Sequence, residues 1–309
     1  MNKSNFKLAF TDNTTYYGKD LEGFYANALL TGNSKSEFKL IPNVKSKVKI
    51  GQLNIGNILQ DADCSFSSTG EGVLAQKTLE VCPVKINLEY CQRTFETDYL
   101  SQLLRPGSNN DEIMPASVEA FLLEQVAIKV SADTEKLVWQ GDSATASYPL
   151  ALCDGLYKQF KADGAVIDVT GTASITVSNV IGELTKVYNA IPETLIHEDD
   201  YRLFISPAVH RAYRQALAAT SNEAYFMQNY GELHFLDVKL SVAPGATTNY
   251  IVGARKSNLL LLTDLVSDFE DVQILPQKSV TGVPVVRMIG EFKFGVNYIY
   301  GSEIVFYWL

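Results

Sequence analysis

The sequence predicts an α+β fold that combines two structured domains with long extended segments, and three observations support this prediction. With 309 residues, of which 46% are hydrophobic and 20% charged, the chain has the composition of a globular protein of about two domains. A helical pattern over residues 115–140 is unusually long. Mixed helix and strand patterns fill residues 151–270, and residues 291–300 alternate in the manner of a β-strand.

Residues 1–43 lack a persistent period and predict an extended N-terminal arm. Within this segment, Phe24, Tyr25 and Leu29 fall at helical spacing, which predicts one short amphipathic stretch. The run that follows, through Phe38, is typical of extended chain. A terminal segment with scattered aromatic residues and no core of its own is expected to lie on another surface.

From residue 44 the pattern becomes β-like, and a polar stretch rich in Asp, Ser and Gly interrupts it at residues 60–72. Loops of this length without structure are uncommon inside compact domains. Two interpretations remain open from the sequence: a disordered surface loop, or a long β-hairpin that reaches away from the body.

Residues 115–140 predict one long α-helix, because Val118, Leu122, Val126 and Val130 stand four residues apart along an apolar stripe. At 1.5 Å per residue, such a helix forms a rod of about 37 Å. No catalytic signature accompanies this helix, so it is interpreted as a structural spine.

Two short motifs mark the end of the long helix and the start of the next region. We expect Gly141 to end the helix in the left-handed conformation, which glycine adopts without steric cost. Trp139 is expected to hold the helix end against a neighbouring layer. Asp142 follows Gly141, and a second motif places Asp154 beside Gly155.

Residues 151–270 predict one compact α/β domain. In this domain a short buried strand precedes a helix at residues 207–220, and Ser206 is placed to act as its N-cap. At the C-terminus we predict two strands joined by a tight turn at Gly301, which would tie the last residues into a sheet.

Charge, cysteine pattern and hydropathy exclude several classes of protein. A formal net charge of −9 argues against a surface built to neutralise phosphates. The four cysteines form no CxxC pair and have no histidine at metal-ligand spacing, so we expect reduced thiols at Cys64, Cys82, Cys91 and Cys153. Neither a secretory signal nor an apolar run of membrane-spanning length is visible, which predicts folding in the cytosol and no membrane contact.

Signatures of catalysis or metal binding are weak in this sequence. His197 stands before Asp199 and Asp200, which leaves open a metal site or an α/β enzyme that uses these three residues. An acidic cluster before a strand is more often a solvated turn. The GxSxG, GxGxxG and phosphate-binding loop motifs are absent. We therefore expect no cofactor, no metal and no enzymatic activity.

The pair Gly141-Asp142, followed by Asp154-Gly155-Leu156, resembles the major capsid (coat) proteins of tailed bacteriophages with the Hong Kong 97-type fold. In that family a long spine helix ends in a Gly-Asp turn, and an Asp-Gly-Leu segment leads into the axial domain. The resemblance covers residues 40–309 in order. Further segments similar to the family are an axial strand and helix, a returning segment and a terminal strand pair, at residues 202–217, 259–274 and 292–307.

The resemblance implies a fold with an N-terminal arm, an extended β-hairpin loop, a peripheral domain with a long spine helix, and an axial α/β domain. The implied parts are the arm at 1–43, the first peripheral part at 44–150, the loop at about 55–80, the spine helix at about 115–140, the axial domain at 151–270, the peripheral return at 271–296 and the terminal axial strand at 297–309.

The resemblance also implies that the arm and the loop lie on neighbouring subunits. Candidate intersubunit contacts are then Phe24, Tyr25, Leu29, Phe38, Asp61, Asp63, Phe66, Glu71 and Lys77. Residues expected to have a structural role within the subunit are Trp139, Gly141, Asp142, Asp154 and Gly155.

The implied function is self-assembly into the pentamers and hexamers of an icosahedral shell that encloses the double-stranded DNA genome of a tailed phage. Implied partners are further copies of the chain, a portal protein, separate scaffold or decoration proteins, and DNA contacted without sequence specificity. The implied location is the virion, after assembly in the cytoplasm of the host bacterium. Two alternatives remain open: an encapsulin-type nanocompartment shell protein, and a structural protein of a phage tail or baseplate.

Overall fold

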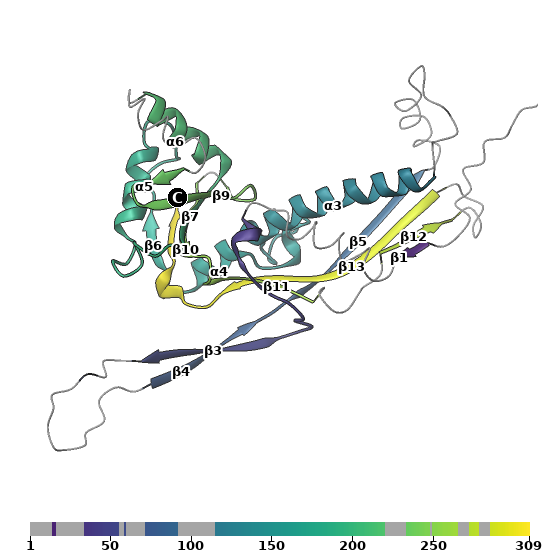
Figure 1. Ribbon diagram of the computed structural model, residues 1–309, viewed down its shortest axis with the longest axis horizontal. Helices are drawn as coiled ribbons and strands as arrows, with labels where there is room; N and C mark the ends of the chain where they lie inside the picture. The colour runs from purple at the N-terminus through teal and green to yellow at the C-terminus, as the bar shows by residue number, and fades with distance from the viewer. Residues whose placement is uncertain are drawn as a thin grey trace, which may run out of the picture.

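The computed structural model describes residues 14–16, 34–55, 59, 72–91, 115–219, 233–247, 249–264, 272–277 and 285–309. Over these residues the chain is α+β, as predicted. A long sheet is covered by one long helix, an α/β unit stands at one end, and a β-hairpin projects from the body (Figure 1). Within these ranges, no helix combines the length and the apolar character needed to cross a membrane.

The long sheet is organised around β13 (Val285–Tyr298), which pairs antiparallel with β5 (Cys82–Cys91) along one side. Along its other side, β13 pairs antiparallel with β12 (Val272–Pro276) and then with β11 (Leu259–Thr263). Alternate residues of β13 are buried because successive side chains of a strand point to opposite faces.

Two short strands from the N-terminal part of the chain complete this sheet. β1 (Thr14–Tyr16) pairs antiparallel with β12, and β2 (Lys39–Ile41) pairs parallel with β11. Parts of the segment predicted as an arm on a neighbouring subunit therefore belong to the sheet of their own subunit.

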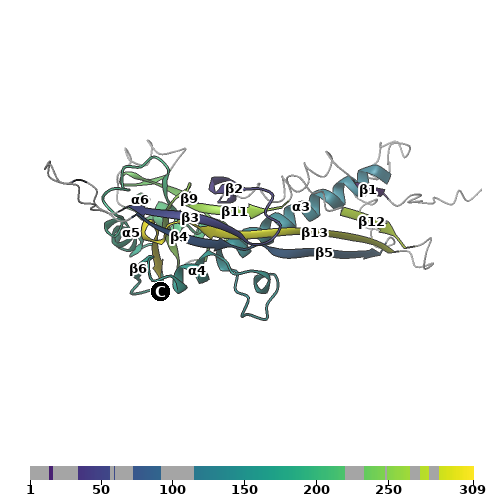
Figure 2. The same cartoon turned by 90° about the horizontal axis from the view of Figure 1, so that it is seen from below.

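The long helix α3 (Pro115–Gln140) has 26 residues and matches the predicted spine helix. Figures 1 and 2 both show it running along the length of β5 and β13. Val126, Leu137 and Val138 share one core with the inward side chains of these two strands. Val126 and Val130 of the apolar stripe seen in the sequence thus lie on the face that the helix turns to the sheet.

The α/β unit contains its own six-stranded sheet, which we call the small sheet. Its strands, in spatial order, are β6 (Ile167–Thr170), β14 (Val305–Trp308), β10 (Ile251–Arg255), β7 (Tyr201–Ile205), β9 (Val238–Val242) and β8 (His234–Phe235). Three helices pack against this sheet: α4 (Leu156–Ala162), α5 (Val180–Asn189) and α6 (Pro207–Ala219). The backbone amide of Val209 donates to Oγ of Ser206 at 3.2 Å, which confirms the predicted N-cap of α6.

The central strand β7 joins two hydrophobic cores. Leu203 and Ile205 enter the core that contains α5 and α6, whereas Phe204 enters the core that contains α3 and α4. Because this alternation places one face of the small sheet against the end of the spine helix, the α/β unit and the long sheet share a core.

Two sequence predictions about the C-terminal half are wrong. β13 and β14 do not form a hairpin, since β14 pairs with β10 and β6, and the 3₁₀ turn η4 (Gly301–Glu303) separates the two strands. β11 was expected in the axial domain but pairs with β13 in the long sheet. Strand periodicity shows that a strand exists, not which sheet receives it.

The expectation that all four cysteines are reduced thiols is also wrong. Cys82 and Cys153 form a disulfide between residues whose Cα atoms are 6.0 Å apart, although 71 positions separate them in the sequence. Cys91 is exposed and forms no disulfide, and Cys64 lies outside the described residues. A pairing across such a separation depends on tertiary structure and leaves no local pattern.

The projecting hairpin consists of β3 (Val48–Ile55) and β4 (Gly72–Leu79), which pair antiparallel over their whole length. The hairpin interpretation is therefore confirmed for these strands, and they begin before the predicted loop boundary at residue 55. Most of the tip lies outside the described residues.

Candidate assembly elements

Two glycines bring the end of α3 and the start of α4 into backbone contact. The amide of Gly155 donates to the carbonyl of Gly141 at 2.8 Å, and the amide of Gly141 donates to the carbonyl of Leu137 at 3.1 Å. A Cβ on Gly155 would lie 2.6 Å from both the nitrogen of Gly141 and the carbonyl oxygen of Leu137. A Cβ on Gly141 would overlap the carbonyl oxygen of Cys153. Neither position leaves room for a side chain.

The predicted reason for glycine at position 141 is wrong. Its φ lies outside the left-handed region, so the helix does not end there through a left-handed cap. Glycine is required because two backbone segments meet without side chains between them.

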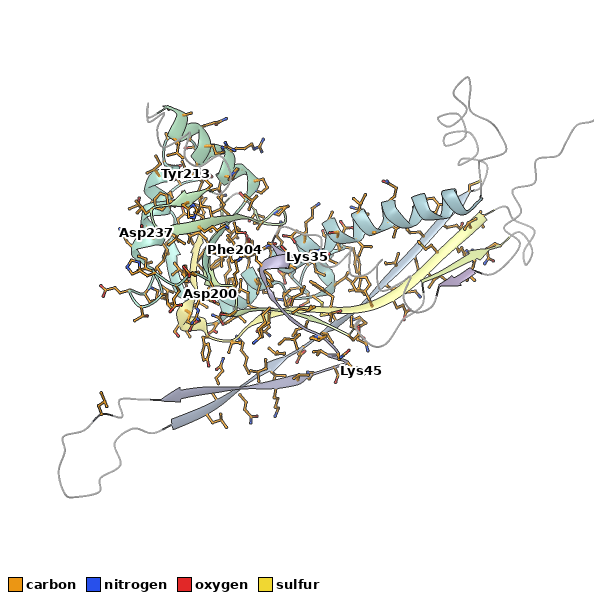
Figure 3. The ribbon with its side chains drawn as sticks, viewed as in Figure 1. Lys35, Lys45, Asp200, Phe204, Tyr213 and Asp237 are labelled. Atoms are coloured by element: carbon orange, nitrogen blue, oxygen red, sulfur yellow. A yellow bond between two sulfur atoms is a disulfide. The ribbon has the colours of Figure 1, made fainter. Side chains whose placement is uncertain are left out.

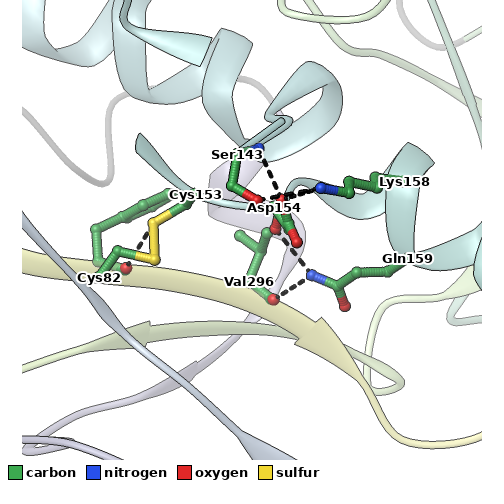
Figure 4. The surroundings of a disulfide bond; sticks show 8 residues. Cys82, Ser143, Cys153, Asp154, Lys158, Gln159 and Val296 are labelled. Atoms are coloured by element: carbon green, nitrogen blue, oxygen red, sulfur yellow. Dashed lines mark hydrogen bonds and ion pairs between the residues drawn. A yellow bond between two sulfur atoms is a disulfide. The ribbon is translucent and has the colours of Figure 1, made fainter. Parts of the chain in front are cut away.

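Two carboxylates and a lysine surround this junction, and Figure 4 shows one of the carboxylates, Asp154, with Lys158. Nζ of Lys158 lies 2.7 Å from Asp142 and 2.8 Å from Asp154. The backbone amide of Ser143 also donates to Asp154 at 2.8 Å. The hydrogen bond from Lys158 lowers the pKa of the Asp142 carboxyl. Asp142 and Asp154 thus act within their own subunit, where they tie the turn after α3 to the first turn of α4.

Trp139 is fully buried at the end of the spine helix. Its ring centroid lies 5.7 Å from that of Phe38, 5.6 Å from that of Tyr157 and 5.5 Å from that of Phe204. Its indole Nε1 donates to Oγ of Ser34 at 3.1 Å. The indole therefore packs the helix end against α4, the α/β sheet and the N-terminal segment together.

Residues 34–38, which we call the arm clip, are anchored on the spine helix at one end. Oγ of Ser34 donates to the carboxylate of Glu135, and the buried Lys35 donates to Thr134 at 2.8 Å. Burial lowers the pKa of Lys35 to about 8, although the negative charge of Glu135 opposes this shift. Figure 3 shows Lys35 between α3 and the α/β unit.

The other end of the arm clip is anchored on the α/β unit. Oγ of Ser241 donates to Glu37 at 2.7 Å, and Nζ of Lys256 lies 3.1 Å from the same carboxylate. The ring centroid of Phe38 lies 5.7 Å from that of Phe204. The arm clip consequently bridges the spine helix and the small sheet.

These contacts correct one predicted intersubunit residue. Phe38 is only 7% exposed and lies in the core of its own subunit, so the predicted contact with a neighbour at this position is wrong. The ring of Phe38 packs against the rings of Trp139 and Phe204. Burying an aromatic ring in this core stabilises the subunit more than placing it on a surface arm would. The other predicted arm contacts, Phe24, Tyr25 and Leu29, lie outside the described residues.

The two faces of the β3–β4 hairpin differ in exposure because alternate side chains of a strand point to opposite sides. On the face turned to the body, Ile50, Gln52, Lys77 and Leu79 are buried or partly buried, whereas Val48 and Ala75 are exposed. On the opposite face, which we call the outward face, all five residues whose exposure the structure describes are exposed: Lys49, Gly51, Leu74, Gln76 and Thr78.

Lys77 anchors the hairpin to the end of β13. Its Nζ lies 3.0 Å from the ring centroid of Tyr298, whose hydroxyl donates to Asp163 at 2.5 Å. Burial lowers the pKa of Lys77 to about 8, against the attraction of Asp163. Burial and the hydrogen bond to Asp163 raise the pKa of Tyr298. Nε2 of Gln52 adds a hydrogen bond to the carbonyl of Ile299.

Lys77 was predicted as an intersubunit contact, and the structure places it in contact with Tyr298 of its own chain. The remaining predicted loop contacts, Asp61, Asp63, Phe66 and Glu71, lie outside the described residues. Their contact with a neighbour stays a prediction.

The residues of the enzymatic alternative lie at the surface of the α/β unit. His197 and Asp199 are exposed, whereas Asp200 accepts a hydrogen bond from Ser257 at 2.6 Å and lies 3.2 Å from Nε of Arg255. In the part of the chain that the structure describes, no three side chains of His, Cys, Asp or Glu gather as metal ligands.

Solved structures with a similar fold are capsid proteins of phages and related particles. The capsid of the native GTA particle matches with a TM-score of 0.61 and 12% identity, over 98% of this chain and 94% of that chain. A chain of the procapsid of satellite phage P4 matches with a TM-score of 0.58 and 10% identity, over 93% of this chain and 98% of that chain.

A virus-like particle from Pyrococcus furiosus is also similar, with a TM-score of 0.50 and 11% identity, over 94% of this chain and 100% of that chain. No known family profile matches the sequence, and no curated relative matches it. The likeness is therefore one of fold, and it extends over nearly the whole chain.

Replacing Gly141 by Ala is expected to lower the free energy of unfolding by about 3 kcal/mol or more, because the new methyl group overlaps backbone atoms that have no room to move. Urea unfolding of the purified subunit measures this change. As a matched control, Gly164→Ala should be nearly neutral, since nothing lies within 4 Å of its Cβ position. Equal stability of the two variants would contradict the proposed backbone contact.

Replacing Phe38 by Ala is expected to lower the free energy of unfolding of the subunit by about 3–5 kcal/mol, as for other buried phenylalanines. Lys39→Ala, at the exposed neighbouring position, should change it by less than about 0.5 kcal/mol. If both variants unfold like the wild type, Phe38 does not belong to the core of the subunit.

Lys77 is expected to be acetylated with a pH inflection near 8, below the ordinary lysine value of 10.5. The folded state then holds fewer protons than the unfolded state between these two values, so this group adds stability as the pH rises through that window. Peptide mass mapping after acetylation at a series of pH values measures the inflection. Asp163→Asn should lower it further, because the attraction for the ammonium is lost. An inflection near 10.5 would mean that the amine is in solvent.

Proposed function

Since this chain has the fold of phage major capsid proteins, we propose that it is the major capsid protein of a tailed phage. In this proposal, many copies assemble into the pentamers and hexamers of an icosahedral shell that encloses double-stranded DNA. The observation that carries the proposal is the projecting hairpin: every residue of its outward face whose exposure the structure describes is exposed, in a chain that matches capsid subunits over nearly its whole length.

The hairpin argues for a partner because an isolated two-stranded sheet is only marginally stable in water. Leu74 on the outward face is 65% exposed, and Leu59 near the tip is 93% exposed. Both would lose unfavourable contact with water if the hairpin lay on another subunit. A closed lattice of identical chains supplies such a surface at every position.

The long sheet offers surfaces that another subunit could cover. Among the described residues, no strand pairs with the outer edge of β5, and open strand edges are prone to association. Between β5 and α3 lies a groove of about 370 Å³. Its apolar lining includes Val84, Ile86, Leu88, Val126, Val130 and Leu137.

We assign the parts of the Hong Kong 97-type plan to this chain with adjusted boundaries. The long sheet and α3 correspond to the peripheral domain, the six-stranded sheet with α4, α5 and α6 to the axial domain, and β3 and β4 to the extended loop. Residues 14–16 and 34–41 leave the predicted arm, because they pair or pack within their own subunit. An arm that crosses to a neighbour would end before Ser34.

The net charge of −9 suits a shell that encloses DNA without binding it tightly, since an acidic inner surface does not neutralise phosphates. Besides further copies of the chain, the proposed partners are a portal protein and separate scaffold or decoration proteins. The proposed location is the virion, with assembly in the host cytoplasm.

An encapsulin-type shell is the second candidate, because the Pyrococcus furiosus virus-like particle has a similar fold. Electron microscopy of the expressed chain tests the shell function itself: closed icosahedral particles support it, whereas tubes, open rings or monomers contradict it. Particles isolated from the natural source then separate the two shells, since packaged double-stranded DNA supports the capsid and enclosed protein cargo supports the nanocompartment.

Leu74→Glu is expected to leave the subunit folded but to reduce the yield of closed particles at least tenfold, because a charge would be buried where the outward face meets a neighbour. Gln76→Glu adds the same charge two residues away on the same face and serves as the control for charge alone; it should have a smaller effect. Particle yield is measured by sedimentation, and folding by circular dichroism. Wild-type assembly by Leu74→Glu would exclude Leu74 from the interface.

A further inference from the structure

The Cys82–Cys153 disulfide lies where three parts of the subunit meet (Figure 4). Cys82 begins β5, three residues after the hairpin strand β4 ends at Leu79, and faces Phe294 in the register of the long sheet. Cys153 directly precedes the Asp154-Gly155 pair, and its carbonyl oxygen occupies the space that a side chain on Gly141 would need. The bond therefore joins the base of the hairpin to the junction between the spine helix and the α/β unit.

Other contacts already hold both cysteines near each other. Gln159 donates to the carbonyls of Asp154 at 3.0 Å and Val296 at 2.9 Å, which fixes the junction to β13 beside Phe294. The Cα separation of 6.0 Å lies within the range of ordinary disulfides. The fold thus brings the two sulfur atoms together without requiring the covalent bond to do so.

Capsid subunits in the proposed function fold and assemble in the bacterial cytosol, which keeps thiols reduced. The disulfide and this place of assembly are compatible if the bond forms later. We propose that Cys82 and Cys153 are free thiols during assembly and form a disulfide once the particle leaves the cell. The bond then locks the hairpin base to the domain junction. This inference rests on the proposed function.

The chemistry is thiol–disulfide exchange with a small-molecule disulfide. Cys82 is partly buried and Cys153 is only 4% exposed, so the thiolate of Cys82 meets the oxidant first. It forms a mixed disulfide and expels one small thiolate. The thiolate of Cys153 then attacks Cys82 Sγ and expels the second. Two cysteines are oxidised, one small disulfide is reduced to two thiols, and the two cysteine protons pass to water or the leaving thiolates.

The timing has a physical consequence for assembly. Pentamers and hexamers place the same chain in different surroundings, so the hairpin and the junction must adjust while the shell closes. A loop that spans 71 positions and contains all of α3 is open in the reduced subunit and closed in the oxidised one. Closing a loop of this length restricts the unfolded chain and stabilises the folded one.

The test uses particles of the full chain made in a reducing cytosol and alkylated at lysis with N-ethylmaleimide. Denaturant is present with the reagent so that the buried Cys153 is accessible, and we expect label on both Cys82 and Cys153 at lysis. After incubation of unlabelled, reduced particles with oxidised glutathione, both cysteines should lose reactivity together. The temperature of particle dissociation should then rise by about 5 °C or more. Cys153→Ser should abolish the rise, whereas Cys91→Ser should keep it, since Cys91 lies at the other end of β5 and outside the bond.

Three results would overturn the redox proposal: a bond already complete at lysis, thiols that stay reactive after oxidation, or a bond that forms without any change in dissociation temperature. Failure of the proposed function gives a different result, namely no closed particles in either redox state. Particles that form in the reduced state and do not respond to oxidation contradict only the redox proposal.

Discussion

The backbone contact between Gly141 and Gly155 determines how the two halves of the subunit are joined. The hydrogen bond of 2.8 Å between them requires that neither residue carries a side chain. This contact directs the chain from the end of the spine helix straight into α4. Trp139 lies two residues before Gly141, and Cys153 lies two residues before Gly155. Both residues obtain their positions from this contact, so the aromatic cluster and the disulfide depend on it.

The arm clip couples elements that are distant in the sequence. It contacts the spine helix through Ser34 and Lys35 and the small sheet through Glu37 and Phe38, and it continues directly into β2 and then the hairpin. A shift of the α/β unit against the spine helix would therefore disturb the clip. The angle between the two halves, the start of the arm and the hairpin base are consequently linked within one subunit.

The hairpin divides its side chains between two kinds of contact. The face turned to the body is held by a lysine over an aromatic ring and by a hydrogen bond from Gln52, both within the chain. The outward face has no such contacts among its described residues and keeps Leu74 exposed. Such a division is typical of a segment that its own subunit positions and another subunit covers, and it connects the fold of one chain to the proposed shell.

The sequence alone determined the features that depend on neighbouring residues. The apolar spacing predicted the spine helix, Ser206 predicted the cap of α6, and the order of the motifs indicated a capsid-like fold. Only the tertiary structure decided that Phe38 is a core residue, that Cys82 meets Cys153, and that Gly141 is needed for a close approach. Each of these joins residues far apart in the chain, and local periodicity carries no information about which distant partner a residue will meet.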